Sequence, residues 1–230
     1  MTRLTYALAD GVATITMDDG KANALSPAML DDLGFALDRA EADAATAVVL
    51  AGRPGRFSGG FDLGVLNAGG PDAERMLRGG FTLAERILGL PFPVVAACTG
   101  HAVAMGSFLL CAADHRIGAA GTFTIQANEV RIGLTMPYAA LALLRHHLTP
   151  SAFDRAAVLG EPFTPDEAVV AGFLDRVVDP ADVVTVAQAT AASYATLDPV
   201  AHLGTKQRAR AAVLAELADA IEREFALTPA

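Results

Sequence analysis

The sequence has no tryptophan, and aromatic residues make up only 6% of its 230 positions. Charged residues are also scarce at 19%, whereas hydrophobic residues reach 53%. So apolar a composition excludes an intrinsically disordered chain, because enough apolar surface is present to offset the entropy of ordering. The length suits one α/β domain with a sizeable core, or such a core with a small appendage.

Basic residues are a minority among the few charges. Lysine and arginine number 17 against 26 aspartates and glutamates, which gives a formal net charge of -9 at pH 7. This balance argues against nucleic acid or an anionic membrane surface as a partner. A small anionic ligand remains compatible with it, since a few local basic residues suffice to receive one.

Cysteine is nearly absent too. The two cysteines, Cys98 and Cys111, both stand in apolar segments, and no spacing resembles a zinc site. We therefore expect buried thiols in a reducing compartment and no bound metal. The N-terminal segment lacks the apolar core of a signal peptide, and the apolar run 94–113 is interrupted by Thr99 and Gly100. A buried strand, turn and helix explain that run better than a membrane span, so we expect a cytoplasmic protein.

Periodicity predicts an α/β chain in which strands mostly come in pairs followed by a helix. Alternation around Asp10-Gly11 predicts a β-hairpin over 3–17. Further strands are expected at 48–51, 94–98, 116–118, 122–125 and 174–178. Helices are expected over 71–90, 105–112, 137–146, 150–159 and 181–225. Two more are expected to begin at the Ser26-Pro27 cap and at the capping box Thr164–Glu167. We expect a break at Gly79-Gly80 in the helix 71–90, and an interruption near Asp198-Pro199 in the helix 181–225. Residues 1–180 would form the core, and 181–230 an appended helical region.

Three short stretches have residues suited to chemistry. The glycine-rich loop 52–60 and the small residues at 104–106 each precede a helix, where backbone N–H groups bind anions or a developing oxyanion. The loop is nonetheless more often a tight connection, and close helix packing explains 104–106 equally well. Glu129 is a lone carboxylate among apolar residues, where burial would raise its pKa and suit it to acid–base work. A glutamate in a loop is more commonly solvated or a helix cap.

Five segments, in order, resemble motifs of the crotonase superfamily, the enoyl-CoA hydratases and isomerases. The resemblance covers about residues 5–180. Its segments are Asn23-Ala24-Leu25, Phe57–Leu63 against FxxGxDL, Pro93–Gly106 against PVIAAVNGxAxGGG, Asp114–Ile117 against DxRI, and Phe163–Val178. The resemblance implies a spiral of ββα units, a C-terminal helical region used for trimerisation, and a homotrimer or dimer of trimers. It also implies an acyl-CoA thioester as substrate and no further cofactor.

The resemblance also assigns site residues. The backbone N–H groups of Phe61 and Met105 correspond to the family's oxyanion hole, although both side chains are larger than usual. Glu129 corresponds to the family's second catalytic glutamate. Lys21, Arg53 and Arg56 are candidate partners for the CoA phosphates. The positions implied for substrate and CoA binding are Ala22, Asn23, Ala24, Ser58, Gly60, Asp62, Leu63 and Gly106.

One departure from the family pattern decides the functional hypothesis. The hydratases of the family use two glutamates, and Phe108 stands where the first would be. The single glutamate in an Asn128-Glu129 context resembles the Δ3,Δ2-enoyl-CoA isomerases, in which one base moves a proton. Isomerisation is therefore the leading hypothesis. The alternatives are enoyl-CoA hydratase activity with a substitute for the missing group, and an acyl-CoA-binding protein without catalysis.

Overall fold

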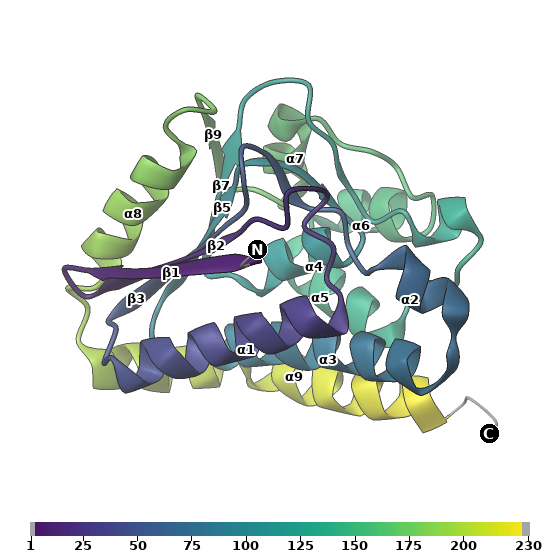
Figure 1. The fold of residues 1–230 in the computed structure, drawn as a ribbon, viewed down its shortest axis with the longest axis horizontal. Coiled ribbons are helices and arrows are strands. Elements are labelled where there is room, and N and C mark those ends of the chain that lie inside the picture. Colours follow the sequence, from purple (N-terminus) through teal and green to yellow (C-terminus); the bar gives the residue numbers. More distant parts are fainter. Residues whose placement is uncertain (1–2, 227–230) are drawn as a thin grey trace.

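A computed structural model describes residues 3–226 of the chain (Figure 1). Two sheets and several helical layers make up the fold. The strands are β1 (Leu4–Ala9), β2 (Val12–Met17), β3 (Ala47–Ala51), β4 (Gly55–Ser58), β5 (Val94–Cys98), β6 (Gly100–Val103), β7 (His115–Ala119), β8 (Ile125–Gln126) and β9 (Arg176–Val178). The helices are α1 (Pro27–Ala42), α2 (Leu63–Ala68), α3 (Gly70–Gly89), α4 (Met105–Ala112), the 3₁₀ helix η1 (Glu129–Ile132), α5 (Tyr138–His147), α6 (Pro150–Ala157), α7 (Pro165–Ala171), α8 (Val183–Tyr194) and α9 (Pro199–Ala226).

Paired strands organise the fold, with one member of each pair in each sheet. The larger sheet has the order β1-β2-β3-β5-β7-β9, and all its pairs are parallel except the β1–β2 hairpin. The smaller, parallel sheet has the order β4-β6-β8. Each pair, β3–β4, β5–β6 and β7–β8, is followed by helix, so successive units advance along both sheets. The predicted spiral of ββα units is confirmed.

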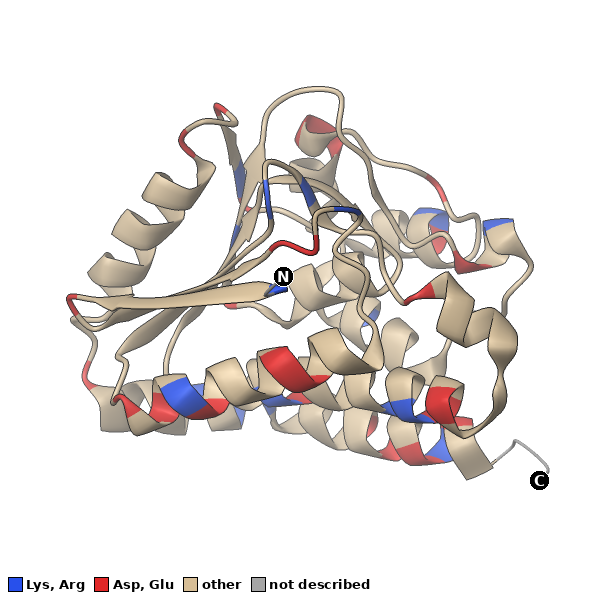
Figure 2. Cartoon of the chain, viewed as in Figure 1, with Lys and Arg blue, Asp and Glu red and all other residues tan. Residues whose placement is uncertain are grey.

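Helices cover both faces of the larger sheet. One face packs on α8, where Val183, Ala187 and Ala191 meet the apolar residues of β3, β5 and β7. The other face contributes to the main core, which includes residues of α1, α3, α4 and α5 (Figure 1). Strands β3 and β5 are buried at every position, as expected for parallel strands between two helical layers. Charged residues concentrate on α1, α3 and α9, while α8 has none (Figure 2).

The long helix α9 lies against α3 and α5 and is fixed by a buried ion cluster. The Lys206 Nζ lies 2.8 Å from one Asp114 carboxylate oxygen, and an Arg210 guanidinium nitrogen lies 2.9 Å from the other. Asp114 also accepts a hydrogen bond from the Val94 N–H, and Lys206 donates to the Phe92 carbonyl. These contacts hold the first half of α9 against the segments where β5 and β7 begin. The division of the chain at residue 180 and the homotrimer stay predictions.

Several predicted elements are confirmed, with local corrections. Ser26 and Thr164 cap α1 and α7 as expected, and the Thr164–Glu167 capping box is complete. The expected break at Gly79-Gly80 is wrong, because α3 runs through both glycines. The loop expected at 52–60 contains β4, a further strand β6 follows β5, and the strand expected at 122–125 is only β8. Glu129 lies in η1, not in an irregular loop.

Candidate functional site

A cavity of about 270 Å³ opens where α2, α3, α4, η1 and the end of α9 converge. Its wall is mainly apolar, with four polar or charged side chains. The lining residues are Gly59, Phe61, Leu63, Leu66, Leu77, Phe81, Ala104, Phe108, Asn128, Glu129, Ile132, Leu134, Thr135, Pro137 and Glu224. An enclosed apolar wall with a few polar groups is the usual form of a small-molecule site. Three of its hydrophobic residues, Leu63, Ile132 and Leu134, are exposed and mark the cavity mouth.

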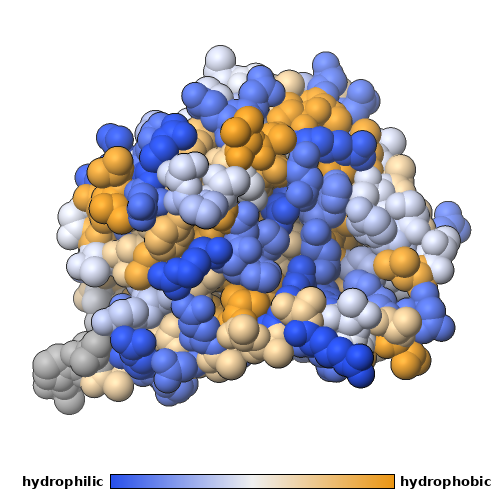
Figure 3. Space-filling view, turned by 180° about the vertical axis from the view of Figure 1, so that it is seen from behind, coloured by the Kyte–Doolittle hydropathy of each residue, from blue (hydrophilic) through white to orange (hydrophobic). Residues whose placement is uncertain are grey.

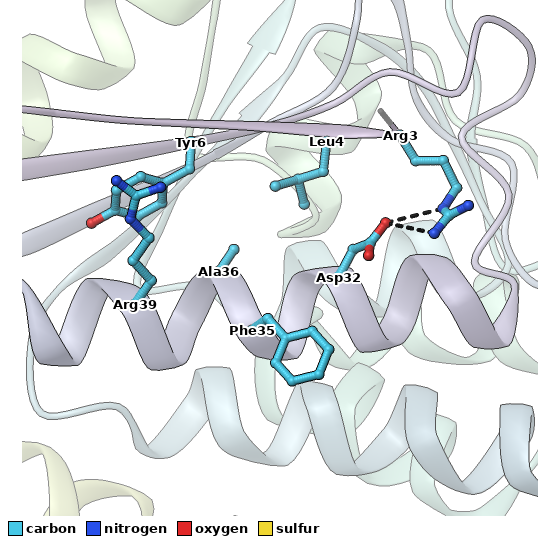
Figure 4. Close-up of a pocket in the computed structure, with 7 residues that line it drawn as sticks. All are labelled: Arg3, Leu4, Tyr6, Asp32, Phe35, Ala36 and Arg39. Atoms are coloured by element: carbon cyan, nitrogen blue, oxygen red, sulfur yellow. Dashed lines mark hydrogen bonds and ion pairs between the residues drawn. The ribbon is translucent and has the colours of Figure 1, made fainter. Parts of the chain in front are cut away.

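A second hollow is formed mainly by polar residues of the surface. A groove between β1 and α1 has polar residues that already pair with one another, Arg3 with Asp32 at 3.0 Å and Arg39 over the Tyr6 ring (Figure 4). The face turned away in Figure 1 shows hydrophobic patches separated by hydrophilic residues (Figure 3). Within residues 3–226, no cluster of three His, Cys, Asp or Glu side chains suited to a metal occurs, and no helix is long and apolar enough to cross a membrane.

Glu129 is the buried acid of the cavity. Its exposed fraction is only 7%, and its Oε2 has no hydrogen-bond partner. Burial raises the pKa of this carboxyl to about 7, because the charged form loses solvation and no cation compensates. The neighbouring Asn128 Oδ1 is likewise buried and unpartnered, although Asn128 occupies the N-cap of η1. These two polar atoms of one cavity wall have no partner within the protein, so each is available to a water or a bound molecule.

The backbone around Glu129 is held firmly. The Leu134 N–H donates to the Glu129 carbonyl at 2.9 Å, which closes the η1 turn. The Gly160 carbonyl accepts from the Gln126 Nε2 at 2.7 Å and from the Arg131 Nε at 2.5 Å. Both sides of Glu129 are thus tied to the segment after α6. Such support keeps the carboxyl in the cavity despite the cost of burying it.

Two backbone N–H groups meet close to the cavity. Met105 is the first residue of α4, so no carbonyl of its own helix accepts from its N–H. The Leu25 N–H donates to the Gly60 carbonyl at 2.8 Å. Since the C=O and N–H of a trans peptide point in opposite directions, the Phe61 N–H faces away from Leu25. The positive end of α4 strengthens the binding of any negative charge placed between these two donors.

Gly60 brings the two donors together. Its φ is +89°, and a Cβ built on it would lie 3.3 Å from the Met105 nitrogen and 2.8 Å from the Ala104 Cβ. Ala104 also has positive φ, 49°, where L-residues carry strain of about 1–3 kcal/mol. Such strain persists only where the surroundings fix the backbone. Two left-handed residues thus permit the close approach of the loop before α2 and the start of α4.

Three of the remaining predicted binding residues, Asn23, Ser58 and Asp62, make hydrogen bonds to nearby backbone groups. The Asn23 side chain donates to the Met17 carbonyl at 2.9 Å and to the Phe57 carbonyl at 3.1 Å. The Ser58 Oγ donates to the Asn23 carbonyl and accepts from the Gly60 N–H. Asp62 caps α2 through the Gly64 N–H. These side chains are therefore engaged in hydrogen bonds within the protein.

The predicted residues divide by their place in the structure. Glu129, Phe61 and Leu63 line the cavity, with Met105 and Gly106 at the adjoining start of α4. Ala22, Asn23, Ala24, Ser58, Gly60 and Asp62 do not line it. Arg53 donates to the Lys21 carbonyl at 2.8 Å and so is partly engaged. The role of these residues in CoA binding stays a prediction.

Three phenylalanines form part of the apolar wall. The Phe61 and Phe81 ring centroids lie 6.0 Å apart edge to face, and those of Phe81 and Phe108 lie 6.2 Å apart and stacked. The Phe61 ring occupies the space that a Cβ on Gly80 would need, so Gly80 serves packing and not a helix break. Sequence reasoning missed Asn128 and Glu224 as cavity residues. Glu224 belongs to α9 and follows Glu129 by about a hundred residues, so no local sequence pattern indicates that it lines the cavity.

The spiral of paired strands, with a largely apolar cavity that holds one buried carboxyl, defines an α/β protein with a small-molecule site. Over residues 8–228 the chain matches the family model described as enoyl-CoA hydratase/isomerase, and it belongs to that family. This membership confirms the resemblance found in the motifs.

Solved and curated relatives extend the comparison. An enoyl-CoA hydratase from Mycobacterium ulcerans is 48% identical, with a TM-score of 0.95, over 98% of this chain and 99% of that one. A structure described as an enoyl-CoA isomerase of Mycobacterium tuberculosis is 47% identical, with a TM-score of 0.95 and the same coverage, and a second structure of that protein is described as a probable enoyl-CoA hydratase. A probable enoyl-CoA hydratase of Bacillus subtilis is 30% identical over 203 residues, 86% of this chain and 78% of the relative. Similar proteins are therefore named both as enoyl-CoA hydratases and as enoyl-CoA isomerases.

Proposed function

We propose that the protein shifts the double bond of an enoyl-CoA, converting a 3-enoyl thioester into the 2-enoyl isomer. The observation that carries this proposal is a single buried, unpartnered carboxyl, Glu129, in a largely apolar wall that includes Phe108. One base suffices for isomerisation, because the same group removes and returns the proton. Orienting a water between two acids is not possible where one position is a phenylalanine.

In the proposed reaction, the Glu129 carboxylate removes a proton from C2 of the 3-enoyl thioester. The electrons of the broken C–H bond form a dienolate, whose oxygen accepts hydrogen bonds from the Phe61 and Met105 N–H groups. The protonated Glu129 then gives the proton to C4, and the double bond lies between C2 and C3. An oxyanion donor of this kind contributes about 3 kcal/mol to lowering the barrier. No carbon–oxygen bond forms and no redox change occurs.

Hydration of a 2-enoyl-CoA is the second candidate, and one observation favours it. The unpartnered Asn128 Oδ1 beside Glu129 provides an acceptor that a water molecule would satisfy. Several similar proteins are also named hydratases. A third candidate, an acyl-CoA-binding protein without catalysis, requires that Glu129 serve no chemical step, which its burial in the cavity wall argues against.

The decisive measurement compares the two reactions on the same preparation. We expect kcat/KM for isomerisation of 3-hexenoyl-CoA to exceed kcat/KM for hydration of crotonyl-CoA by at least about tenfold, because general acid–base catalysis needs a positioned group for each proton moved. A ratio in the opposite sense would assign the protein to the hydratases. Thermal stabilisation by both thioesters with no turnover of either would assign it to the non-catalytic binders.

The pH dependence follows from the state of Glu129 that reacts. The base must be deprotonated, and burial raises its pKa to about 7. We therefore expect kcat/KM for isomerisation to rise with pH and level off above an inflection near 7, instead of the range of about 4 typical of a solvated glutamate. Stopped-flow rates at constant ionic strength over about pH 5–9 measure this profile. A flat profile would show that Glu129 is not the base.

A further inference from the structure

Glu224 is the second carboxylate that lines the cavity, and it comes from the last turn of α9. Unlike Glu129, it is partly exposed, and it has one fixed partner. Its Oε2 accepts a hydrogen bond from the Tyr138 N–H at 2.9 Å. Tyr138 is the first residue of α5, so the carboxylate caps the positive end of that helix. A charged group held in this way keeps a fixed position at the edge of the cavity.

The neighbouring residues of α9 fix the helix end from both sides. The Arg223 guanidinium lies 4.2 Å from the centroid of the Tyr138 ring. Arg78 of α3 lies 4.5 Å from the centroid of the Phe225 ring and pairs with Glu222 at 2.5 Å. These contacts clamp α9 to α3 and α5, the two helices whose residues border the cavity next to Glu224. The position of Glu224 is therefore a consequence of packing and not of a free helix end.

The charge of Glu224 meets no compensating cation at the cavity. Among the described residues that line the cavity, the only ionisable groups are Glu129 and Glu224, and none is basic. The ion pairs of residues 3–226 include several on α9, but none to Glu224. The wall opposite consists largely of aliphatic side chains and the rings of Phe61, Phe81 and Phe108. A negative charge entering this space would meet the acidic groups of Glu129 and Glu224 and no cationic partner.

We propose that Glu224 makes the acyl site selective by charge, admitting uncharged acyl chains and rejecting chains that end in a carboxylate. This inference rests on the proposed function, since it assigns the cavity to the acyl group of a CoA thioester. The phenylalanine wall attracts a hydrocarbon chain and already disfavours an anionic end, because a buried carboxylate loses its hydration. Glu224 adds the repulsion of a like charge at the edge of the cavity to this penalty. The substrate class is thereby narrowed to monocarboxylic, uncharged enoyl thioesters.

The test compares 3-hexenoyl-CoA with the CoA monothioester of 3-hexenedioic acid, which has the same number of carbons and a terminal carboxylate. We expect the protein to favour the neutral thioester by at least about a hundredfold in kcat/KM. Glu224→Gln retains an oxygen that accepts from the Tyr138 N–H but removes the charge. This variant should lower the preference by at least about tenfold, mainly through faster turnover of the dicarboxylic thioester. The same comparison between 3-octenoyl-CoA and the CoA monothioester of 3-octenedioic acid places the charge two carbons further along the chain.

Glu74→Gln is the control for loss of one negative charge, because Glu74 is an exposed residue of α3 that lies outside the cavity and takes no part in the contacts of α9 described above. It should leave the preference unchanged. An unchanged preference in Glu224→Gln, or an equal fall in Glu74→Gln, would overturn the inference. If neither thioester is turned over, the proposed function fails, but the inference is still decided by binding. Thermal stabilisation by hexanoyl-CoA and by the CoA monothioester of adipic acid must then show the same preference and the same loss in Glu224→Gln.

Discussion

Replacing Glu129 with glutamine should lower kcat for 3-hexenoyl-CoA isomerisation by about 10²–10⁴-fold, the usual contribution of a positioned acid–base group. Glutamine has nearly the shape of glutamate but cannot accept the C2 proton at neutral pH. The cavity would therefore keep its wall and lose its base. Because Glu129 is buried, with Oε2 unpartnered and its pKa raised to about 7, the neutral side chain fits the apolar site without a new unpaired charge.

Two measurements separate loss of chemistry from loss of structure. Hexanoyl-CoA has no double bond to move, and it should stabilise Glu129→Gln thermally as much as the unchanged protein. Glu85→Gln is a fitting control, because burial also raises the pKa of Glu85, yet Glu85 lies on α3 outside the cavity. Its turnover should stay within about twofold of normal. Turnover by Glu129→Gln that approaches the normal rate would exclude Glu129 as the base and end the isomerase assignment.

Local signals in the sequence predicted elements whose conformation is decided by neighbours along the chain. The Asp10-Gly11 turn, the Ser26 cap and the Thr164–Glu167 capping box are such cases, because a few adjacent hydrogen bonds determine each. Strands β4 and β6 escaped prediction because each is short and is stabilised by its partner in the smaller sheet. The continuous α3 shows the same limit. Its Gly79-Gly80 pair indicates a break locally, yet the Phe61 ring fills the space beside Gly80.

The candidate site divides along the same line. The burial of Glu129 follows from its apolar neighbours in sequence, and Gly60 and Gly106 indicated backbone approach. The sequence alone did not indicate that the Asn128 side chain, at the N-cap of η1, would make no capping hydrogen bond. It also did not indicate that Glu224 of α9 would line the cavity. The position of Glu224 depends on contacts of the last turn of α9 with α3 and α5, such as the ion pair of Arg78 with Glu222, residues 144 positions apart. Tertiary ion pairs of this kind have no periodic signature.

Gly60→Ala should reduce isomerisation by about 10²–10³-fold while the protein still folds, because it separates the two oxyanion donors. The new Cβ would lie 2.8 Å from the Ala104 Cβ and 2.9 Å from the Val103 carbonyl oxygen, distances that force the loop before α2 away from α4. The Phe61 N–H follows Gly60 directly and would move with it. The loss should appear in kcat more than in KM, since the oxyanion forms only during the reaction.

Strain alone is a competing explanation, because Gly60 has φ +89° and alanine is disfavoured there. Gly20→Ala controls for it: Gly20 has φ +73°, a Cβ added to it would have no atom within 4 Å, and it lies outside the cavity. It should lose about 1 kcal/mol of unfolding free energy and keep its turnover. Adding Ala104→Gly to Gly60→Ala removes one of the two contacts and should restore part of kcat. Equal losses of activity in Gly20→Ala and Gly60→Ala would place the effect in backbone strain and remove the Phe61 N–H from the proposed oxyanion hole.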